Sequence, residues 1–321
     1  MKLKRNLVEE NKVREVEKPK AIVIAGPTAS GKTALSIELA KQINGEIVSC
    51  DSMQIYEEMD IGTAKPTQEE KQGILHYMMD CVSPEKRYSV SDYKKGATHA
   101  IEQILQKQKV PIVVGGTGLY INSLIYHIEY EPIGIDQEYR ELLEKRVQKE
   151  GLQTLYEEAV KIDPKAMEKI SNRDQKRILR VLEIYQQTGK TKTEQEQQSR
   201  QKENPYQFKV FVLQMDREVL YERINQRVNQ MIEQGLIQEV EEIYQKYQQF
   251  PTAMQGIGYK EVVSYLRGEI TKEEMIEKIK METRRYAKRQ ITWFKKIEDV
   301  IWLNGEEKIQ NNINIILEEI K

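Results

Sequence analysis

Residues 26–33, GPTASGKT, decide the fold of this chain. They follow an apolar run, residues 21–25, and precede an apolar pattern of helical spacing, residues 34–40. A G-x-x-x-x-G-K-S/T sequence between a strand and a helix predicts a phosphate-binding loop, because its glycines let backbone N–H groups turn inward and the helix adds its positive end. We therefore expect a di- or triphosphate to bind at Gly26, Pro27, Thr28, Ala29, Ser30, Gly31, Lys32 and Thr33.

Two side chains of this loop add to what its backbone can bind. Lys32 supplies a mobile cation, and Thr33 supplies a hydroxyl that can reach a Mg²⁺ ion held by the phosphates. The loop alone leaves open which phosphate compound binds and which bond breaks.

The composition restricts the class of protein. A chain of 321 residues is long enough for one large domain or two, and its net charge of −1 means that a nucleic-acid site would have to be a local patch. Neither a long apolar segment nor a secretory signal is visible, so we expect a cytoplasmic protein with no membrane partner. The two cysteines, Cys50 and Cys81, lack the spacing of a disulfide framework or a zinc site.

Two further stretches are predicted to reach the edge of the sheet where the phosphate loop lies. A strand over residues 46–51 ends in Asp51, and a strand over 110–114 is followed by Gly115-Gly116-Thr117-Gly118. Because ligands of open α/β sheets bind outside the carboxyl ends of the strands, Asp51 and Thr117 should face the loop. Asp51 then has three possible roles: a cap or turn former, a general base, or a Mg²⁺ ligand. Thr117 could equally cap a helix.

The chain divides into a core, an insertion and a tail. Residues 20–131 and 202–321 predict an α/β core resembling P-loop NTPases, with a parallel sheet flanked by helices. Residues 132–201 contain helical patterns and no strand, which predicts an all-helical insertion. Segment 190–204 has almost no apolar residues and is predicted to be a mobile loop, and residues 1–19 a disordered tail.

Basic residues gather on three predicted helices. Lys176, Arg177 and Arg180 lie in the insertion, where they could be solvated or could contact a phosphate backbone. Arg223 and Arg227 are four residues apart on a helix over 220–232, a spacing that suits a diphosphate clamp as well as a solvated face. A long helix over 271–296 has a basic second half with interleaved aromatic residues, which could contact RNA or simply pack.

Several stretches in fixed order make a narrower identification possible. The stretches are GPTASGKT, DSMQIY, MDIGTAKP, HYMMD, GGTGLYI, MIEQGLIQEV, QGIGYKE and TRRYAKRQITWF. Together, from about residue 20 to 304, they resemble the tRNA dimethylallyltransferase family, the bacterial tRNA isopentenyltransferases. The resemblance implies transfer of a dimethylallyl group from dimethylallyl diphosphate to N6 of the adenine on the 3′ side of the anticodon, with release of diphosphate. It also implies a Mg²⁺ cofactor and a tRNA anticodon stem-loop as partner, and we expect a monomer.

The resemblance also implies roles for particular residues. Asp51 corresponds to the general base, Thr117 to a residue at the far wall of the channel, and Arg223 to an arginine that reaches the diphosphate, with Arg227 as the alternative. Residues expected to contact tRNA are Asp51, Ser52, Met53, Gln54, Thr117, Arg140, Lys176, Arg177 and Arg180. Two positions depart from the family pattern: Met53 replaces a different side chain in many members, and Arg173 stands where an Asn-Asp pair is commoner.

Two other functions are compatible with a phosphate loop. A small-molecule or nucleoside kinase would consume ATP and carry an arginine-rich lid, and it would have no use for an RNA-gripping insertion. A non-catalytic RNA-binding module would keep its role when Asp51 is replaced by asparagine.

Overall fold

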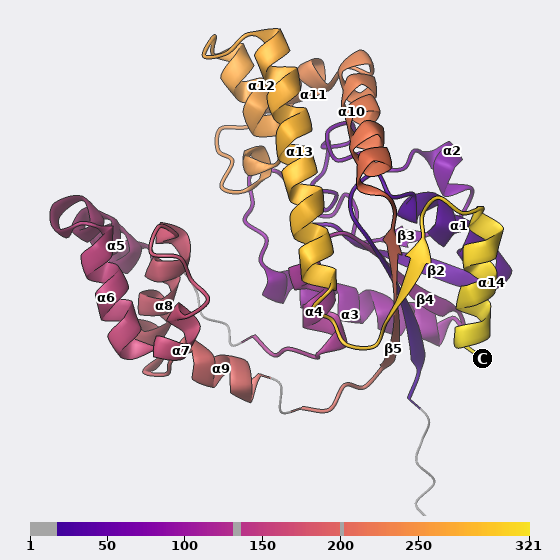
Figure 1. Cartoon of the computed structure of the whole chain (residues 1–321), viewed down its shortest axis with the longest axis horizontal. Coiled ribbons are helices and arrows are strands. Elements are labelled where there is room, and N and C mark those ends of the chain that lie inside the picture. The colour runs from indigo at the N-terminus through magenta and orange to yellow at the C-terminus, as the bar shows by residue number, and fades with distance from the viewer. Residues whose placement is uncertain (1–17, 131–135, 200–201) are drawn as a thin grey trace, which may run out of the picture.

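A six-stranded parallel sheet forms the centre of the computed structural model, which describes residues 18–130, 136–199 and 202–321 (Figure 1). Its strands are β1 (Lys20–Ala25), β2 (Gly45–Cys50), β3 (His76–Tyr77), β4 (Val110–Gly115), β5 (Gln207–Gln214) and β6 (Val300–Asn304). They pair in the order β3-β2-β4-β1-β5-β6. The sheet confirms the predicted fold class and begins at Lys20, as predicted; residues 1–17 of the expected tail lie outside the described residues.

The strand register explains why distant sequence stretches meet. Ala25, at the end of β1, pairs with Gly115, and Cys50, at the end of β2, pairs with the same glycine. Because all strands run in parallel, the residues that follow these three strand ends leave the sheet at one edge. Gly115 must be glycine here, since an added Cβ would lie 2.0 Å from the carbonyl oxygen of Cys50.

Helices cover both faces of the sheet. Alternate residues of β1 point to opposite faces, so Ile22 and Ile24 pack with α1 (Lys32–Gln42) and α14 (Ile309–Glu319). Val23 and Ala25 belong to the apolar cluster of α3 (Val90–Gln106) and α4 (Gly118–Ile125) on the other face. Strands buried on both faces are apolar throughout, which is why the strand before the phosphate loop reads as an unbroken apolar run.

A group of helices stands above the carboxyl ends of the strands (Figure 1). It comprises α10 (Arg217–Glu233), α11 (Leu236–Lys246), α12 (Tyr259–Leu266) and α13 (Lys272–Phe294), with a short 3₁₀ helix at Ala253–Gln255. These helices share an apolar cluster with the loop after β2, through Ile55, Tyr56 and Met59. The loop that carries Asp51 is therefore packed against this helical group. The part of the chain that the structure describes contains no helix long and apolar enough to cross a membrane.

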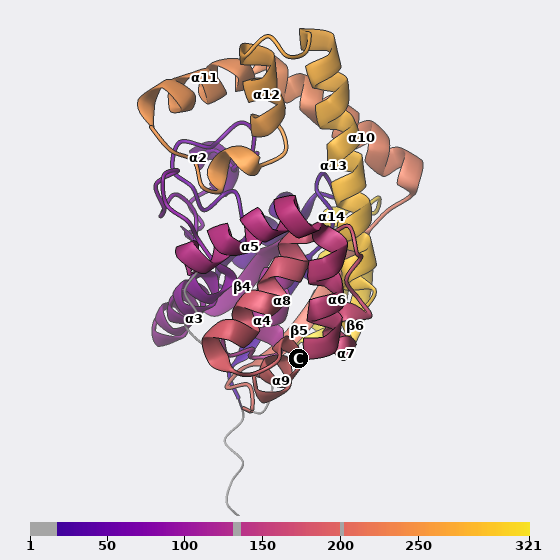
Figure 2. The ribbon, with the colours of Figure 1, turned by 90° about the vertical axis from the view of Figure 1, so that its left-hand side faces the viewer.

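The insertion is a helical body with its own core. Its helices are α5 (Gln137–Glu150), α6 (Leu152–Ile162), α7 (Pro164–Met167), α8 (Gln175–Thr188) and α9 (Lys192–Gln198). Leu143, Leu155 and Leu182 are fully or almost fully buried among them. Figure 1 shows the body at the left of the sheet, and Figure 2 views it from that side.

The prediction of a mobile loop over 190–204 is wrong for the described part of that segment, where α9 lies. Thr191 and Glu194 form a capping box, which stabilises the start of the helix in spite of its polar composition. The helix is tied to the insertion by Asp163, which accepts the N–H of Thr193 at 2.8 Å and its hydroxyl at 2.6 Å. Other elements that were not predicted from the sequence are α2 (Gln68–Lys71), the two-residue β3 and α14.

Candidate active site

The phosphate loop adopts the conformation that its glycines predict. Gly26 has a φ of 154° and Gly31 a φ of 90°, and Gly31 is the residue from which α1 starts. A Cβ at Gly26 would lie 3.0 Å from both the Leu213 carbonyl and the Ser30 hydroxyl, so the loop can close only around a glycine. In this state the Lys32 ammonium donates a hydrogen bond to the Pro27 carbonyl at 2.6 Å.

The Lys32 ammonium is electrostatically unusual. Burial, and then the positive charge of Arg227, lower the pKa of Lys32 to about 7, whereas Asp51 opposes that shift. Burial also lowers the pKa of Arg227. Lys32 and Arg227 place two positive groups in the wall of one cavity, an arrangement that suits a multiply charged anion.

We expect binding of inorganic diphosphate to draw a proton onto Lys32. The anion raises the Lys32 pKa from its starting value of about 7, so above pH 7 the complex holds more protons than the free enzyme, and affinity falls as pH rises. Calorimetry in buffers of different ionisation enthalpy measures this uptake. In the Lys32→Arg variant, whose side chain stays charged, only the ligand's own titration should remain. Equal proton uptake by the variant and the wild type would contradict the prediction.

Asp51 combines a turn-forming role with a free acceptor. Its Oδ1 accepts the backbone N–H groups of Met53 at 2.8 Å and Gln54 at 3.3 Å, which holds the carboxylate in a fixed orientation. Its Oδ2 accepts no hydrogen bond from the described residues, and Asp51 lines a cavity that also touches Lys32. One carboxylate oxygen is thus fixed while the other can accept a proton from a ligand.

Thr117 occupies the N-cap position of α4, yet its side chain does not cap the helix. Its hydroxyl oxygen accepts the N–H of Ser52 at 3.0 Å and lies 3.4 Å from the Ser52 hydroxyl. Ser52 lines the cavity directly, so Thr117 orients the wall next to Asp51. The cap alternative raised by the sequence is therefore wrong.

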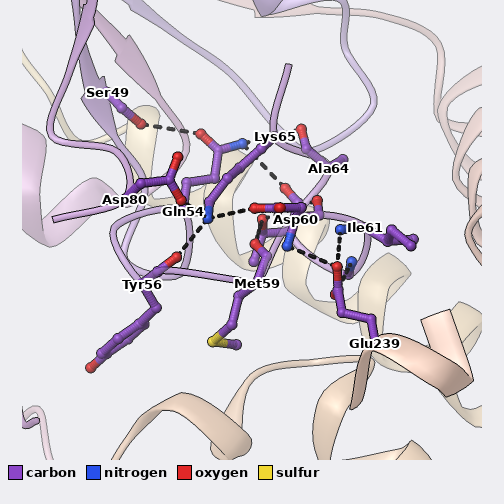
Figure 3. Close-up of polar contacts among 12 residues, drawn as sticks. Ser49, Gln54, Tyr56, Met59, Asp60, Ile61, Ala64, Lys65, Asp80 and Glu239 are labelled. Carbon is purple, nitrogen blue, oxygen red and sulfur yellow. Dashed lines mark hydrogen bonds and ion pairs between the residues drawn. The ribbon is translucent and has the colours of Figure 1, made fainter. Parts of the chain in front are cut away.

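The loop that follows Asp51 is held by its own side chains (Figure 3). Gln54 accepts the Ser49 hydroxyl at 3.1 Å, and its amide donates to the carbonyls of Thr63 at 3.2 Å and Ala64 at 3.3 Å. Gln54 lines the cavity, as does Met53, but its amide group is occupied within the loop. It shapes the cavity wall more than it offers hydrogen bonds to a ligand.

Two charged residues fix the far part of the same loop (Figure 3). The Lys65 ammonium, whose side chain is only 5% exposed, donates to the Tyr56 carbonyl at 2.6 Å and forms ion pairs with Asp60 and Asp80. Glu239 of α11 accepts three consecutive backbone N–H groups, those of residues 60–62, at 2.6–3.1 Å. These contacts hold the loop in one conformation, so it forms a fixed wall of the cavity.

The cavity itself has a volume of about 410 Å³, within the range of small-molecule sites. The phosphate loop contributes Lys32 and Thr33 at one end, and residues 51–54 line another part. Helix α10 supplies an apolar wall with Ile224, Val228 and Met231. Helix α13 contributes residues that the sequence did not single out for the site, among them Tyr286, Arg289 and Gln290.

Tyr286 extends the polar cluster around Asp51. Burial and the Asp51 charge raise the pKa of Tyr286, while a hydrogen bond to Thr117 opposes that rise. The Arg289 guanidinium lies 5.7 Å from the centre of the Tyr286 ring. The basic helix predicted from the sequence therefore contributes directly to the cavity wall.

Arg223 and Arg227 occupy different places. A second cavity of about 780 Å³ also borders the phosphate loop, and both arginines line it. Only Arg227 also lines the cavity with Asp51. Arg223 is exposed, with its guanidinium 3.5 Å from the carbonyl of Gly305. The geometry thus favours Arg227, the alternative in the sequence analysis, as the arginine nearer to Lys32 and Asp51.

The four basic residues predicted to contact tRNA in the insertion lie on α5 and α8, outside the cavity. Arg140 forms a bidentate pair with the fully buried Glu183, at 2.5 and 3.0 Å, and Arg180 joins it at 3.2 Å. Lys176 and Arg177 are exposed, and Arg177 pairs with Asp174 at 3.3 Å. Two of the four side chains are thus oriented by a buried carboxylate, and two face solvent.

Thr33 is the residue of the loop that was predicted to contact a metal ion. Its side chain lines the cavity beside Lys32. No group of three or more His, Cys, Asp or Glu side chains in the described ranges could hold a metal ion. A metal contact at Thr33 stays a prediction.

Comparison with known proteins agrees with this architecture. The family model described as IPP transferase matches residues 54–297. A tRNA dimethylallyltransferase of Acetivibrio thermocellus is 50% identical over 302 residues, covering 92% of this chain and 96% of the relative. A relative of the same name from Carboxydothermus hydrogenoformans is 45% identical over 301 residues, covering 94% and 97%.

Solved structures agree as well. The full-length tRNA isopentenylpyrophosphate transferase of Bacillus halodurans superimposes with a TM-score of 0.71 at 42% identity, covering 94% of this chain and 96% of that one. A eukaryotic dimethylallyltransferase acting on tRNA gives a TM-score of 0.80 at 32% identity, covering 94% and 79%. Sequence motifs, sheet topology and relatives thus agree, and this chain belongs to the tRNA dimethylallyltransferase family.

Proposed function

We propose that this chain transfers a dimethylallyl group from dimethylallyl diphosphate to N6 of the adenine on the 3′ side of a tRNA anticodon, with release of diphosphate. One observation carries the proposal: a single cavity of about 410 Å³ joins a phosphate loop at one end to a carboxylate with a free oxygen, Asp51. A prenyl diphosphate and an amine need these two features on opposite sides of the reacting carbon.

The diphosphate end stabilises the leaving group. Backbone N–H groups of the phosphate loop, other than that of Thr28, act together with the Lys32 ammonium and the Arg227 guanidinium. They meet the negative charge that develops as the carbon–oxygen bond breaks. Mg²⁺, when bound, would neutralise diphosphate oxygens, with the Thr33 hydroxyl as its protein contact. The apolar wall of Ile224, Val228 and Met231 is suited to the prenyl chain.

The other end prepares the nucleophile. The N6 lone pair of adenine is delocalised into the ring, so the amine must be oriented and must lose a proton as the new bond forms. The free Oδ2 of Asp51 accepts the N6–H hydrogen bond and takes that proton. Since the base is stacked in the anticodon loop, it must be extruded to reach this position.

The insertion would hold the stem-loop. Arg140 and Arg180, oriented by Glu183, keep N–H groups that can meet phosphate oxygens, and Lys176 and Arg177 add mobile charge. The basic half of α13 adds positive charge at the cavity through Arg289. We infer a monomer that acts in the cytoplasm, where tRNA is modified.

One assay separates this proposal from a kinase and from an RNA-binding module. The purified chain is incubated with an undermodified tRNA, Mg²⁺ and either dimethylallyl diphosphate or ATP, and nucleosides are analysed by mass spectrometry. We expect one isopentenyl adduct per tRNA and none when the target adenine is replaced by guanine. ATP turnover without an adduct would support the kinase, and binding without either reaction would support the binding module.

A further inference from the structure

Gln290 of α13 joins two glycine turns that are far apart in sequence. Its side-chain amide is buried, with the residue only 5% exposed. Its Nε2 donates to the carbonyl of Gly116 at 2.9 Å, and its Oε1 accepts the N–H of Thr28 at 2.9 Å. Thr28 belongs to the phosphate loop and Gly116 to the turn after β4, so one side chain spans both.

The fit at Gly116 is tight. A Cβ added to Gly116 would lie 2.1 Å from Nε2 of Gln290, closer than any real contact. The backbone of Gly116 is not left-handed, so an alanine there would cause no backbone strain. It would instead collide with the Gln290 amide. One turn further along α13, Trp293 lies against Gly118 in the same way. The end of α13 is thus seated directly on the second glycine turn.

The two turns that Gln290 joins lead to the two ends of the proposed reaction. On one side, Thr28 lies in the loop that reaches Lys32. On the other side, Gly116 precedes Thr117, whose hydroxyl holds the N–H of Ser52 next to Asp51. Gln290 itself lines the cavity between them, one helical turn after Tyr286. A continuous set of contacts therefore runs from the diphosphate end to the carboxylate.

We propose that Gln290 is a positioning residue that fixes the distance between the phosphate loop and Asp51. The inference rests on the proposed prenyl transfer. In that reaction the leaving diphosphate and the incoming amine must be held on opposite sides of one carbon, and a displacement of about 1 Å can cost about a hundredfold in rate. The Thr28 N–H donates its hydrogen bond to Gln290 and not to a ligand. Gln290 therefore acts by holding the phosphate loop in place.

The test uses the full chain with tRNA and dimethylallyl diphosphate. Gln290→Met keeps the side-chain volume and removes both hydrogen bonds. We expect kcat to fall about a hundredfold while the KM values for both substrates stay within about threefold, because the loss appears in the transition state. Gln245→Met, at an exposed glutamine of α11, is the matched control and should leave kcat unchanged. Wild-type kcat in Gln290→Met would overturn the proposal.

A double-mutant cycle separates positioning from general stability. Gly116→Ala displaces the Gln290 amide and should slow transfer, although Gln290 is intact. Gln290→Ala removes the amide that a Cβ at position 116 would meet. Adding Gly116→Ala to that variant should therefore lower the rate of transfer little further. If the free-energy costs of the two single variants on the rate of transfer add up in the double variant, the inference is overturned. This holds even if the single variants are less stable. Failure of the wild type to transfer would instead refute the proposed function, so the two failures are distinguishable.

Discussion

Replacing Asp51 by asparagine should lower the rate of prenyl transfer by about 10²–10⁴-fold, the range contributed by a general base, while tRNA still binds. In the wild type, Oδ1 of Asp51 accepts the N–H groups of residues 53 and 54. The amide oxygen of the asparagine can accept the same two hydrogen bonds. The loop should therefore stay folded. Only the proton acceptor is lost, so a rapid-quench measurement of adduct formation with pre-bound tRNA isolates the chemical step.

Asp216 provides a matched control for this substitution. It too accepts two backbone N–H groups through Oδ1, those of Glu218 at 2.7 Å and Val219 at 3.4 Å, but it caps α10 and is exposed. Asp216→Asn should leave transfer unchanged, because asparagine caps helices as well as aspartate does. If Asp51→Asn transfers at the wild-type rate, another group takes the proton and the assignment of Asp51 is wrong.

Removal of Arg227 should damage the reaction far more than removal of Arg223. Arg227→Ala is expected to reduce kcat/KM for dimethylallyl diphosphate by about 10²–10³-fold, the cost of deleting one group that stabilises developing negative charge. Arg223→Ala should lower this kcat/KM about tenfold or less, because the exposed Arg223 side chain lines only the second cavity. The two arginines lie one turn apart on α10, so each variant is the control for the other.

The charge on Lys32 offers an independent readout of the same substitution. Arg227 is one cause of the lowered Lys32 pKa, so Arg227→Ala should raise that pKa and shift proton uptake on diphosphate binding to higher pH. Arg223 does not line the cavity shared by Lys32 and Asp51, so its removal should leave the pH dependence of proton uptake unchanged. A larger rate loss in Arg223→Ala than in Arg227→Ala would reverse the assignment.

Much of the core could be predicted because its signals are local. The loop at residues 26–33, flanked by an apolar strand and a helix, fixes one edge of the sheet, and parallel topology then places Asp51 and Thr117 beside it. The helix α9 was missed although its capping box, Thr191 with Glu194, is visible in the sequence. A capping box can start a helix even in a segment with almost no apolar residues.

Other site residues had no local signal to find. Gln290 is a glutamine in a charged helix, and only the approach of Gly116, 174 residues away, makes it a buried bridge. The choice between Arg223 and Arg227 depends on how α10 is rotated against the phosphate loop, which spacing alone does not determine. Glu183, placed within the apolar run of α8, was a sign that Arg140 and Arg180 would be oriented by a buried partner.

The pairing of β1 with β5 sets the order in which the protein can fold. Lys20 lies opposite Gln207, so β1, a central strand, must wait for a segment made 187 residues later. On the ribosome, β1 to β4 can associate early, and the helical insertion can collapse on its own contacts. Until β5 arrives, β1 remains an open edge that can pair with other chains. Because α10 and α13 follow β5, Arg227, Tyr286 and Gln290 join the site last, so synthesis must be nearly complete before the enzyme can act.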